Sequence, residues 1–248
     1  MKKVALITGA GRGIGAATAR LLAKQGYNLA INYVKDKSAA HALINEVSST
    51  GVKALAIKAD VAVESDILNM FSRIDEQLGG ITALVNNAGI LEKQSTLEKM
   101  SVDRLQRIFT TNVIGSFICA RESVKRMSIK NGGHGGTIVN VSSGASLLGA
   151  ANEYIDYAAS KGAIDSMTIG LAKEVAEQGI RVNAVRPGLI YTDIHALGGE
   201  PDRIERLKNT VPMKRGGTAD EVAEAIAWLL SDRSTYTTGS FIDLTGGR

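Results

Sequence analysis

A tyrosine and a lysine stand four residues apart in the segment Tyr157-Ala158-Ala159-Ser160-Lys161. On a helix this spacing places both side chains on one face, one turn apart. A phenol has an unperturbed pKa near 10, so it is a poor proton donor or acceptor at neutral pH unless a nearby cation stabilises the phenolate. The pair therefore suits general acid–base chemistry, with Tyr157 carrying the proton.

The spacing alone is weak, because Tyr33 and Lys37 match it as well. The predicted position in the fold separates the two pairs. Tyr157 follows a predicted strand that ends in a serine pair, Ser142-Ser143, and ligands of open α/β sheets bind beyond the carboxyl ends of the strands. This position favours Tyr157 over Tyr33 for chemistry, and we expect Tyr33 beside the adenosine end of a nucleotide. Taken alone, Tyr157 and Lys161 are better interpreted as an ordinary surface pair.

A glycine-rich turn joins the first predicted strand to an alanine-rich helix, with the sequence Thr8-Gly9-Ala10-Gly11-Arg12-Gly13-Ile14-Gly15. Glycine lets the backbone approach a pyrophosphate, and the helix N-terminus offers unpaired N–H groups with partial positive charge. A strict G-x-G-x-x-G is absent, although Ala16 completes G-x-G-x-x-A. The turn predicts dinucleotide binding, with a tight turn that binds no ligand as the alternative.

The choice of cofactor depends on the end of the second predicted strand, Ile31-Asn32-Tyr33-Val34-Lys35-Asp36. Dinucleotide sites that prefer NAD place an acid about 20 residues after the glycines, and no acid stands at this strand tip. Asp36 keeps NAD as an alternative. Arg12 and Lys35 could instead pair with a ribose 2′-phosphate, so the sequence favours NADP unless both are solvated surface charges.

Short aliphatic runs alternate with helical patterns along the whole chain, which is the order of a parallel sheet with crossover helices. Strands are predicted at Val4–Thr8, Asn28–Tyr33, Lys53–Ala59, Ala83–Asn86, Thr137–Ser142, Arg181–Arg186 and Ser240–Leu244. Helices are predicted at Ile14–Gln25, Ser38–Ser49, Glu64–Leu78, Val102–Met127, Tyr157–Gln178, Asp202–Thr210 and Ala219–Leu230. We expect one α/β domain over residues 1–248, a Rossmann doubly wound, seven-stranded parallel sheet with helices on both faces.

The composition limits the function classes. Of the 248 residues, 44% are hydrophobic and 22% charged, which is typical of globular proteins, and the net charge of +4 without a basic run gives no support for nucleic-acid binding. No run reaches the length of a membrane span. A single cysteine, Cys119, excludes an internal disulfide and a cysteine-based metal site, so we expect no metal and a cytoplasmic location.

All three prolines fall between Arg186 and Ala219, together with two glycine pairs. Long irregular segments of this kind are often mobile and functional. Residues 188–217 are therefore predicted to form a lid over the substrate, with a plain surface excursion as the alternative.

With the glycine turn, Asn86-Asn87-Ala88-Gly89, Ser143 and Tyr157-x-x-x-Lys161 in this order, the chain resembles the compact, single-domain short-chain dehydrogenase/reductases over essentially all of its length. Glucose dehydrogenases and ketoacyl reductases are of this form. The resemblance implies a nicotinamide-dependent oxidoreductase acting on a small carbonyl or secondary alcohol. The cofactor-binding residues it implies, together with those named above, are Thr8, Gly9, Arg12, Gly13, Ile14, Gly15, Asn32, Tyr33, Lys35, Asp60, Val61, Asn87, Ala88, Gly89, Tyr157, Lys161, Pro187, Gly188, Ile190 and Thr192.

The resemblance also implies four catalytic roles. Tyr157 is the general acid in reduction and the base in oxidation, and Ser143 hydrogen-bonds the substrate oxygen. Lys161 holds the ribose and lowers the pKa of Tyr157, while Asn112 positions a water for proton relay. The interval from Ser143 to Tyr157 is one residue longer than the common spacing, so Ser142 is an alternative catalytic serine.

The substrate pocket and the assembly are less determined. Candidate pocket residues are Leu147, Leu148, Glu153, Tyr154, Ile190 and His195, with Glu153 and His195 suited to a hydroxylated substrate. The resemblance implies a homotetramer formed through the helices that hold Asn112 and Tyr157 and through the C-terminal strand. The competing function is a dinucleotide-binding sensor or scaffold without chemistry; a methyltransferase would leave Tyr157 and Lys161 unexplained.

Overall fold

The computed structural model describes residues 3–248 and contains a single sheet of seven strands, all parallel. The strands are β1 (Val4–Ile7), β2 (Asn28–Tyr33), β3 (Ala54–Lys58), β4 (Ala83–Asn86), β5 (Gly136–Val141), β6 (Ile180–Pro187) and β7 (Phe241–Leu244). Their order across the sheet is β3-β2-β1-β4-β5-β6-β7. The predicted α/β fold with seven parallel strands is confirmed.

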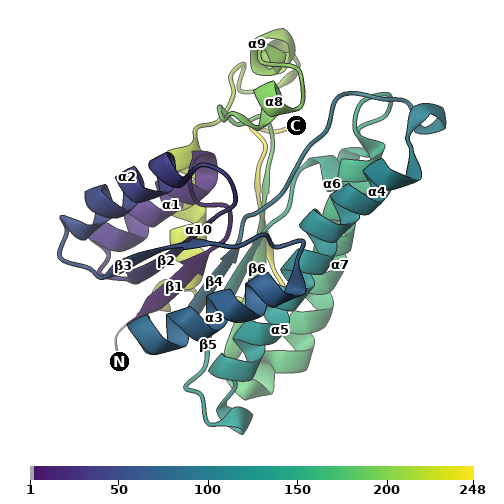
Figure 1. Cartoon of the computed structure of the whole chain (residues 1–248). Coiled ribbons are helices and arrows are strands. Elements are labelled where there is room, and N and C mark those ends of the chain that lie inside the picture. Colours follow the sequence, from purple (N-terminus) through teal and green to yellow (C-terminus); the bar gives the residue numbers. More distant parts are fainter. Residues whose placement is uncertain (1–2) are drawn as a thin grey trace.

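The described chain contains ten α-helices. They are α1 (Gly13–Lys24), α2 (Lys37–Ser48), α3 (Glu64–Leu78), α4 (Val102–Phe109), α5 (Gly115–Met127), α6 (Ala145–Leu148), α7 (Ile155–Val175), α8 (Ile194–Leu197), α9 (Arg203–Leu207) and α10 (Ala219–Leu230). Of these, α8 and α9 lie beyond the strand ends, apart from the helices that cover the sheet (Figure 1). None of the helices in residues 3–248 is both long and apolar enough to cross a membrane.

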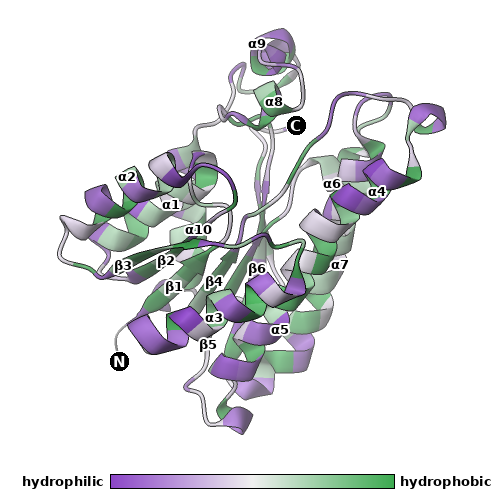
Figure 2. Ribbon diagram, in the orientation of Figure 1, coloured by the Kyte–Doolittle hydropathy of each residue, from purple (hydrophilic) through white to green (hydrophobic). Residues whose placement is uncertain are grey.

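Alternate residues of the central strands pack against opposite layers of helices. Ala5 and Ile7 of β1 lie in one apolar cluster with side chains of α1, α2 and α10, whereas Leu6 lies in another with side chains of α3, α5 and α7. Both faces of the central strands are therefore buried, which explains why these strands are continuous aliphatic runs. Figure 2 shows the hydrophobic colouring concentrated on the strands and on the inward helix faces.

β1 and β4 are neighbours in the sheet, with Ala5 paired to Ala83, although they lie far apart in the sequence. The chain reverses its direction of winding between these two strands. In doubly wound sheets a crevice opens beyond the carboxyl ends of the strands at this switch point. The glycine turn follows β1 and the Asn86–Gly89 segment follows β4, so both border the crevice.

The structure corrects several predicted helices. The helix predicted over Val102–Met127 is interrupted by a π-helical turn at Thr110–Ile114, and the helix of Tyr157 begins two residues earlier, at Ile155. The helix predicted over Asp202–Thr210 covers only Arg203–Leu207 and continues as a 3-10 turn. The short helices α6 and α8 were not predicted, because four residues are too few to display a helical period.

Candidate functional site

A cavity of about 1180 Å³ opens at the carboxyl ends of the strands. It is lined by the glycine turn, the ends of β2 to β6, the N-terminal part of α7 and the segment after β6. Of the predicted site residues it is lined by Gly9, Arg12, Gly13, Ile14, Asn32, Tyr33, Lys35, Asp60, Val61, Asn87, Ala88, Gly89, Ser143, Tyr157, Lys161, Pro187, Gly188, Ile190 and Thr192. Thr8, Gly15 and Asn112 are not among its lining residues.

The glycine turn has the shape that a pyrophosphate requires. Gly9 has a φ of +62°, and a Cβ there would lie 2.9 Å from the Cα of Ala88. A Cβ on Gly15 would lie 2.7 Å from Nδ2 of Asn87. No side chain caps the first turn of α1, so its backbone N–H groups are free to bind an anion. The turn therefore fits the phosphates of a dinucleotide.

The side chains of Thr8 and Asn32 hold the backbone of the glycine turn and of the segment after β4 through hydrogen bonds. The N–H groups of Asn87 and Ala88 both donate to the Thr8 hydroxyl at 3.0 Å. Asn32 is fully buried: its Oδ1 accepts from the N–H of Gly9 at 3.1 Å, and its Nδ2 donates to the Ala59 carbonyl at 2.8 Å. Both side chains, which are predicted to bind the cofactor, use these polar groups to hold the backbone that lines the cavity.

At the tip of β2 the cavity is bordered by one carboxylate, Asp36, and by two cations, Arg12 and Lys35. The Asp36 carboxylate accepts from the N–H of Ala39 at 2.9 Å and caps α2, so it is already engaged. Lys35 is exposed, and Arg12 is 4.0 Å from the Asp193 carboxylate with about half of its side chain exposed. Asp60, predicted beside the adenine, accepts from the N–H of Ala62 at 2.9 Å. The two cations are the groups available for a phosphate.

Tyr157 and Lys161 lie on one face of α7, and Nζ of Lys161 is 5.6 Å from the centre of the Tyr157 ring. Burial raises the pKa of Tyr157 to about 12, although the neighbouring Ser143 side chain favours the phenolate. Burial lowers the pKa of Lys161 to about 8, and the charge of Asp165 partly offsets this. Nζ of Lys161 donates to the Val141 carbonyl at 2.8 Å. The lowering of the Tyr157 pKa by Lys161 stays a prediction for the protein with its cofactor bound.

The two candidate serines differ in environment. Ser142 is buried, and its hydroxyl donates to the Lys161 carbonyl at 3.2 Å, which ties β5 to α7. Both serines line the cavity, but Ser143 is the one beside the Tyr157 phenol. The geometry therefore favours Ser143 over Ser142 as the serine that could meet a substrate.

Asn112 is fully buried at the centre of the π-helical turn. Its Oδ1 accepts from the N–H of Ile90 at 2.8 Å, and its Nδ2 donates to the Ile90 carbonyl at 3.1 Å and to the Ser160 hydroxyl at 3.1 Å. The side chain therefore clasps the segment after β4 against α7. The π-turn, a feature often found at functional sites, was not predicted from the sequence.

The substrate end of the cavity contains Leu148, Glu153, Tyr154, Ile190 and His195, whereas Leu147 is exposed outside it. Nε2 of His195 donates to the Ile190 carbonyl at 3.2 Å, and burial lowers the pKa of its imidazole. Glu153 pairs with Arg203 and Arg206 of the predicted lid, and its role toward a substrate hydroxyl stays a prediction.

Sequence reasoning missed Arg203. This residue is buried, lines the cavity and pairs with both Glu153 and Glu200. Its guanidinium lies 4.9 Å from the centre of the Tyr154 ring. An isolated arginine in a short, irregular segment carries no signal in the sequence that would mark it as buried.

Comparisons with known proteins agree with this architecture. A family model described as enoyl-(acyl carrier protein) reductase matches residues 9–248. The chain is 57% identical to an uncharacterized oxidoreductase of Escherichia coli K12, YgfF, over 99% of both chains. It is 36% identical to the 3-oxoacyl-[acyl-carrier-protein] reductase FabG of Staphylococcus epidermidis, over 100% of this chain and 99% of that protein.

Solved structures give the same answer. A short-chain dehydrogenase from Burkholderia cenocepacia in complex with NADP has a TM-score of 0.90 and 31% identity, covering 99% of this chain and 97% of its own. A 3-ketoacyl-(acyl-carrier-protein) reductase from Brucella melitensis complexed with NADH has a TM-score of 0.91 and 33% identity, with 99% and 98% covered. The chain belongs to the short-chain dehydrogenase/reductase family of oxidoreductases.

Proposed function

We propose that this protein transfers a hydride between NADP and the carbon of a small carbonyl compound or secondary alcohol, with Tyr157 as the proton donor in reduction and the acceptor in oxidation. The observation that carries the proposal is the placement of Tyr157 beside Ser143 in the cavity that also contains the glycine turn. A phenol, a hydroxyl and a phosphate-binding turn in one cavity are what such a reaction needs.

Ser143, Tyr157 and Lys161 have separate roles in the proposed reaction. The nicotinamide supplies or accepts the hydride when it is bound. Ser143 hydrogen-bonds the substrate oxygen, and Tyr157 moves a proton to or from that same oxygen. Lys161 carries a positive charge below about pH 8. A short movement of its ammonium group from the Val141 carbonyl toward the phenol would stabilise the phenolate and bring the pKa of Tyr157 closer to neutral.

NADP is favoured over NAD by the charges at the tip of β2. Arg12 and Lys35 line the cavity, while Asp36 is occupied in capping α2. Related solved structures contain NADP in one case and NADH in another, so both cofactors belong in the test. Gly9, Gly13 and the free N–H groups of α1 would hold the pyrophosphate.

We further propose a cytoplasmic homotetramer, in which residues 188–217 close over the substrate. Apolar side chains that a partner chain could cover are exposed on α5 and α7, including Phe117 and Ile169. Cys119, the single cysteine of the sequence, is buried, and a chain without an internal disulfide suits the reducing cytoplasm.

The test is a screen of NADPH and NADH oxidation with small ketones, aldehydes and 3-oxoacyl thioesters, the last chosen because 3-oxoacyl reductases are relatives. Tyr157→Phe should lower kcat about 100- to 10,000-fold, the usual contribution of general acid–base catalysis, and leave cofactor binding intact. Cofactor binding without turnover of any substrate would favour the sensor or scaffold instead. Full activity of Tyr157→Phe would refute the mechanism.

A further inference from the structure

A buried ion pair joins α4 to the first turn of α7. Nε of Arg104 is 2.6 Å from Oδ2 of Asp156, and Nη2 is 3.2 Å from Oδ1, so the guanidinium holds the carboxylate with two hydrogen bonds. The Arg104 side chain is 10% exposed and that of Asp156 is 0% exposed. Water therefore screens this pair very little.

The same two side chains also bind the backbone on either side of them. Oδ1 of Asp156 accepts from the N–H of Tyr157 at 2.9 Å. Nη1 of Arg104 donates to the Lys93 carbonyl at 2.6 Å. The pair thus connects three segments: α4, the segment that follows β4, and the backbone of Tyr157.

Tyr157 needs such a connection because it is the third residue of α7. The first four N–H groups of a helix have no partner within the helix. Tyr154 stands at the N-cap position and its side chain makes no capping hydrogen bond. The backbone of Tyr157 is therefore held by Asp156, and the carboxylate also interacts favourably with the helix dipole.

We propose that Arg104 and Asp156 are positioning residues for Tyr157, an inference that rests on the proposed function of this tyrosine. A buried ion pair is weak evidence for stability, because the desolvation of two charges offsets their attraction. It does fix geometry. A displacement of about 1 Å at a reacting group can lower a rate about 100-fold.

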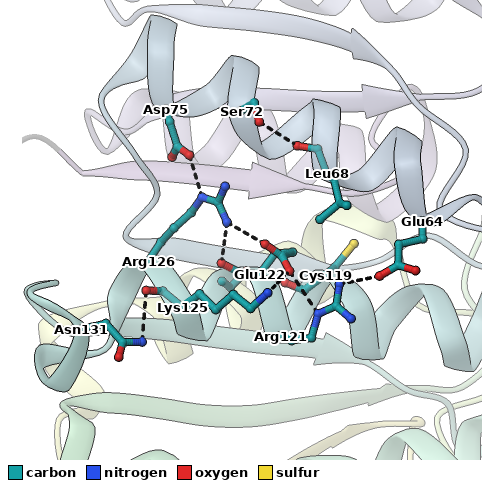
Figure 3. A network of polar contacts seen from close by, with 11 residues as sticks. Glu64, Leu68, Ser72, Asp75, Cys119, Arg121, Glu122, Lys125, Arg126 and Asn131 are labelled. Atoms are coloured by element: carbon teal, nitrogen blue, oxygen red, sulfur yellow. Dashed lines mark hydrogen bonds and ion pairs between the residues drawn. The ribbon is translucent and has the colours of Figure 1, made fainter.

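A second buried carboxylate supplies a matched control. Glu122 of α5 is 5% exposed and pairs with Arg121, Lys125 and Arg126 at 3.0, 2.8 and 3.0 Å. Arg126 continues to Asp75 of α3 at 2.8 Å, so this network joins α5 to α3 (Figure 3). Glu122 does not line the cavity. Glu122→Gln removes the same charge from a buried network whose ion pairs lie within α5 and between α5 and α3.

The experiment compares Asp156→Asn, Arg104→Met, the double variant and Glu122→Gln. Both single changes at the pair should lower kcat about 10- to 100-fold while KM changes less than about threefold. In the oxidation direction the rising limb of the kcat profile should move to higher pH, because a displaced phenol is stabilised less by Lys161. Glu122→Gln should lower the melting temperature and leave kcat and its pH profile unchanged.

The double variant separates positioning from stability. It leaves neither buried charge alone, so its melting temperature should recover toward that of the wild type, whereas kcat should not recover. Recovery of kcat with stability would overturn the proposal, as would a kcat within about threefold of the wild type in Asp156→Asn.

One readout needs no turnover. In protein labelled with 3-fluorotyrosine, the ¹⁹F resonance lost in Tyr157→Phe reports the surroundings of that ring. It should shift in Asp156→Asn and not in Glu122→Gln, and an unchanged resonance would overturn the positioning role. Absence of activity in the wild type would refute the proposed function only.

Discussion

Lys161 lies with its ammonium group 5.6 Å from the centre of the Tyr157 ring, and both side chains are held in surroundings that disfavour their charged forms. The tyrosine is kept neutral up to about pH 12, and the lysine loses its proton at about pH 8. The fold therefore brings the two side chains of the proposed acid–base pair together, while their surroundings keep both pKa values away from those the proposed reaction needs.

The buried lysine should be visible in the pH dependence of stability. Burial lowers the pKa of Lys161 from 10.5 to about 8, so between these values the unfolded chain binds a proton that the folded protein has released. Stability therefore rises with pH across this window. We expect the free energy of unfolding of the wild type, relative to Lys161→Met, to rise by about 2 kcal/mol from pH 8 to pH 10. Urea unfolding measures it, and a flat or falling difference contradicts the prediction.

Arg12 and Lys35 should determine the preference for NADP. Arg12→Ala and Lys35→Ala should each weaken NADPH binding about tenfold, which is about 1.4 kcal/mol, and leave NADH binding unchanged. Thermal-shift titrations with the two cofactors measure this directly. Lys24→Ala removes an exposed charge from the far end of α1 and serves as the control. Tighter binding of NADH by the wild type would reverse the assignment.

Alanine should destabilise the protein at Gly15 of the glycine turn but not at Gly11. Alanine normally stabilises a helix by about 1 kcal/mol over glycine, but a Cβ on Gly15 would lie 2.8 Å from the Cα of Ala10. Backbone atoms move with difficulty, so Gly15→Ala should lower the free energy of unfolding by about 1–3 kcal/mol. A Cβ on Gly11 meets nothing within 4 Å, so Gly11→Ala should be neutral. Equal stability of the two variants in urea unfolding would contradict this.

Glu153 should hold the predicted lid in place. Its carboxylate pairs with Arg203 of α9 and, at 3.3 Å, with Arg206. Glu153→Gln should therefore speed amide hydrogen exchange in residues 194–207, measured by mass spectrometry. The control is Glu205→Gln, whose partners Tyr191 and Lys208 both lie within the predicted lid, residues 188–217, so this change removes no link across the cavity. Unchanged exchange in Glu153→Gln would show that the segment is held by packing.

The proposed assembly is open to a direct measurement. Sedimentation velocity should give a mass four times that of the 26.1 kDa chain. Phe117→Glu places a charge on an exposed apolar residue of α5 and should shift the protein toward smaller species. A monomeric wild type would refute the homotetramer.

The sheet was predictable because its strands are short, apolar and regularly separated by helical patterns. All seven strands were located to within one or two residues. The glycine turn was found from residue types and spacing, and the catalytic set from its resemblance to a known family; the structure brings most of these residues to one cavity. These features depend on local sequence, which is why a single chain suffices to find them.

Features that depend on long-range contacts were not predictable. The π-turn at Asn112 exists because its side chain reaches Ile90 and Ser160, 22 and 48 residues away. The occupation of Asp36 by a helix cap, and of Glu153 by Arg203, likewise depends on folded geometry. The burial of the Tyr157 phenol, which raises its pKa to about 12, is likewise a property of the folded structure.

The burial of Cys119 has a practical consequence. Its thiol is fully enclosed and burial raises its pKa to about 12, so it should be inert toward maleimides at neutral pH. A cysteine introduced at the exposed Leu197 of α8 would then be the sole reactive thiol of the chain. A fluorophore attached there would follow movement of the segment over the substrate in real time, without removal of the native cysteine.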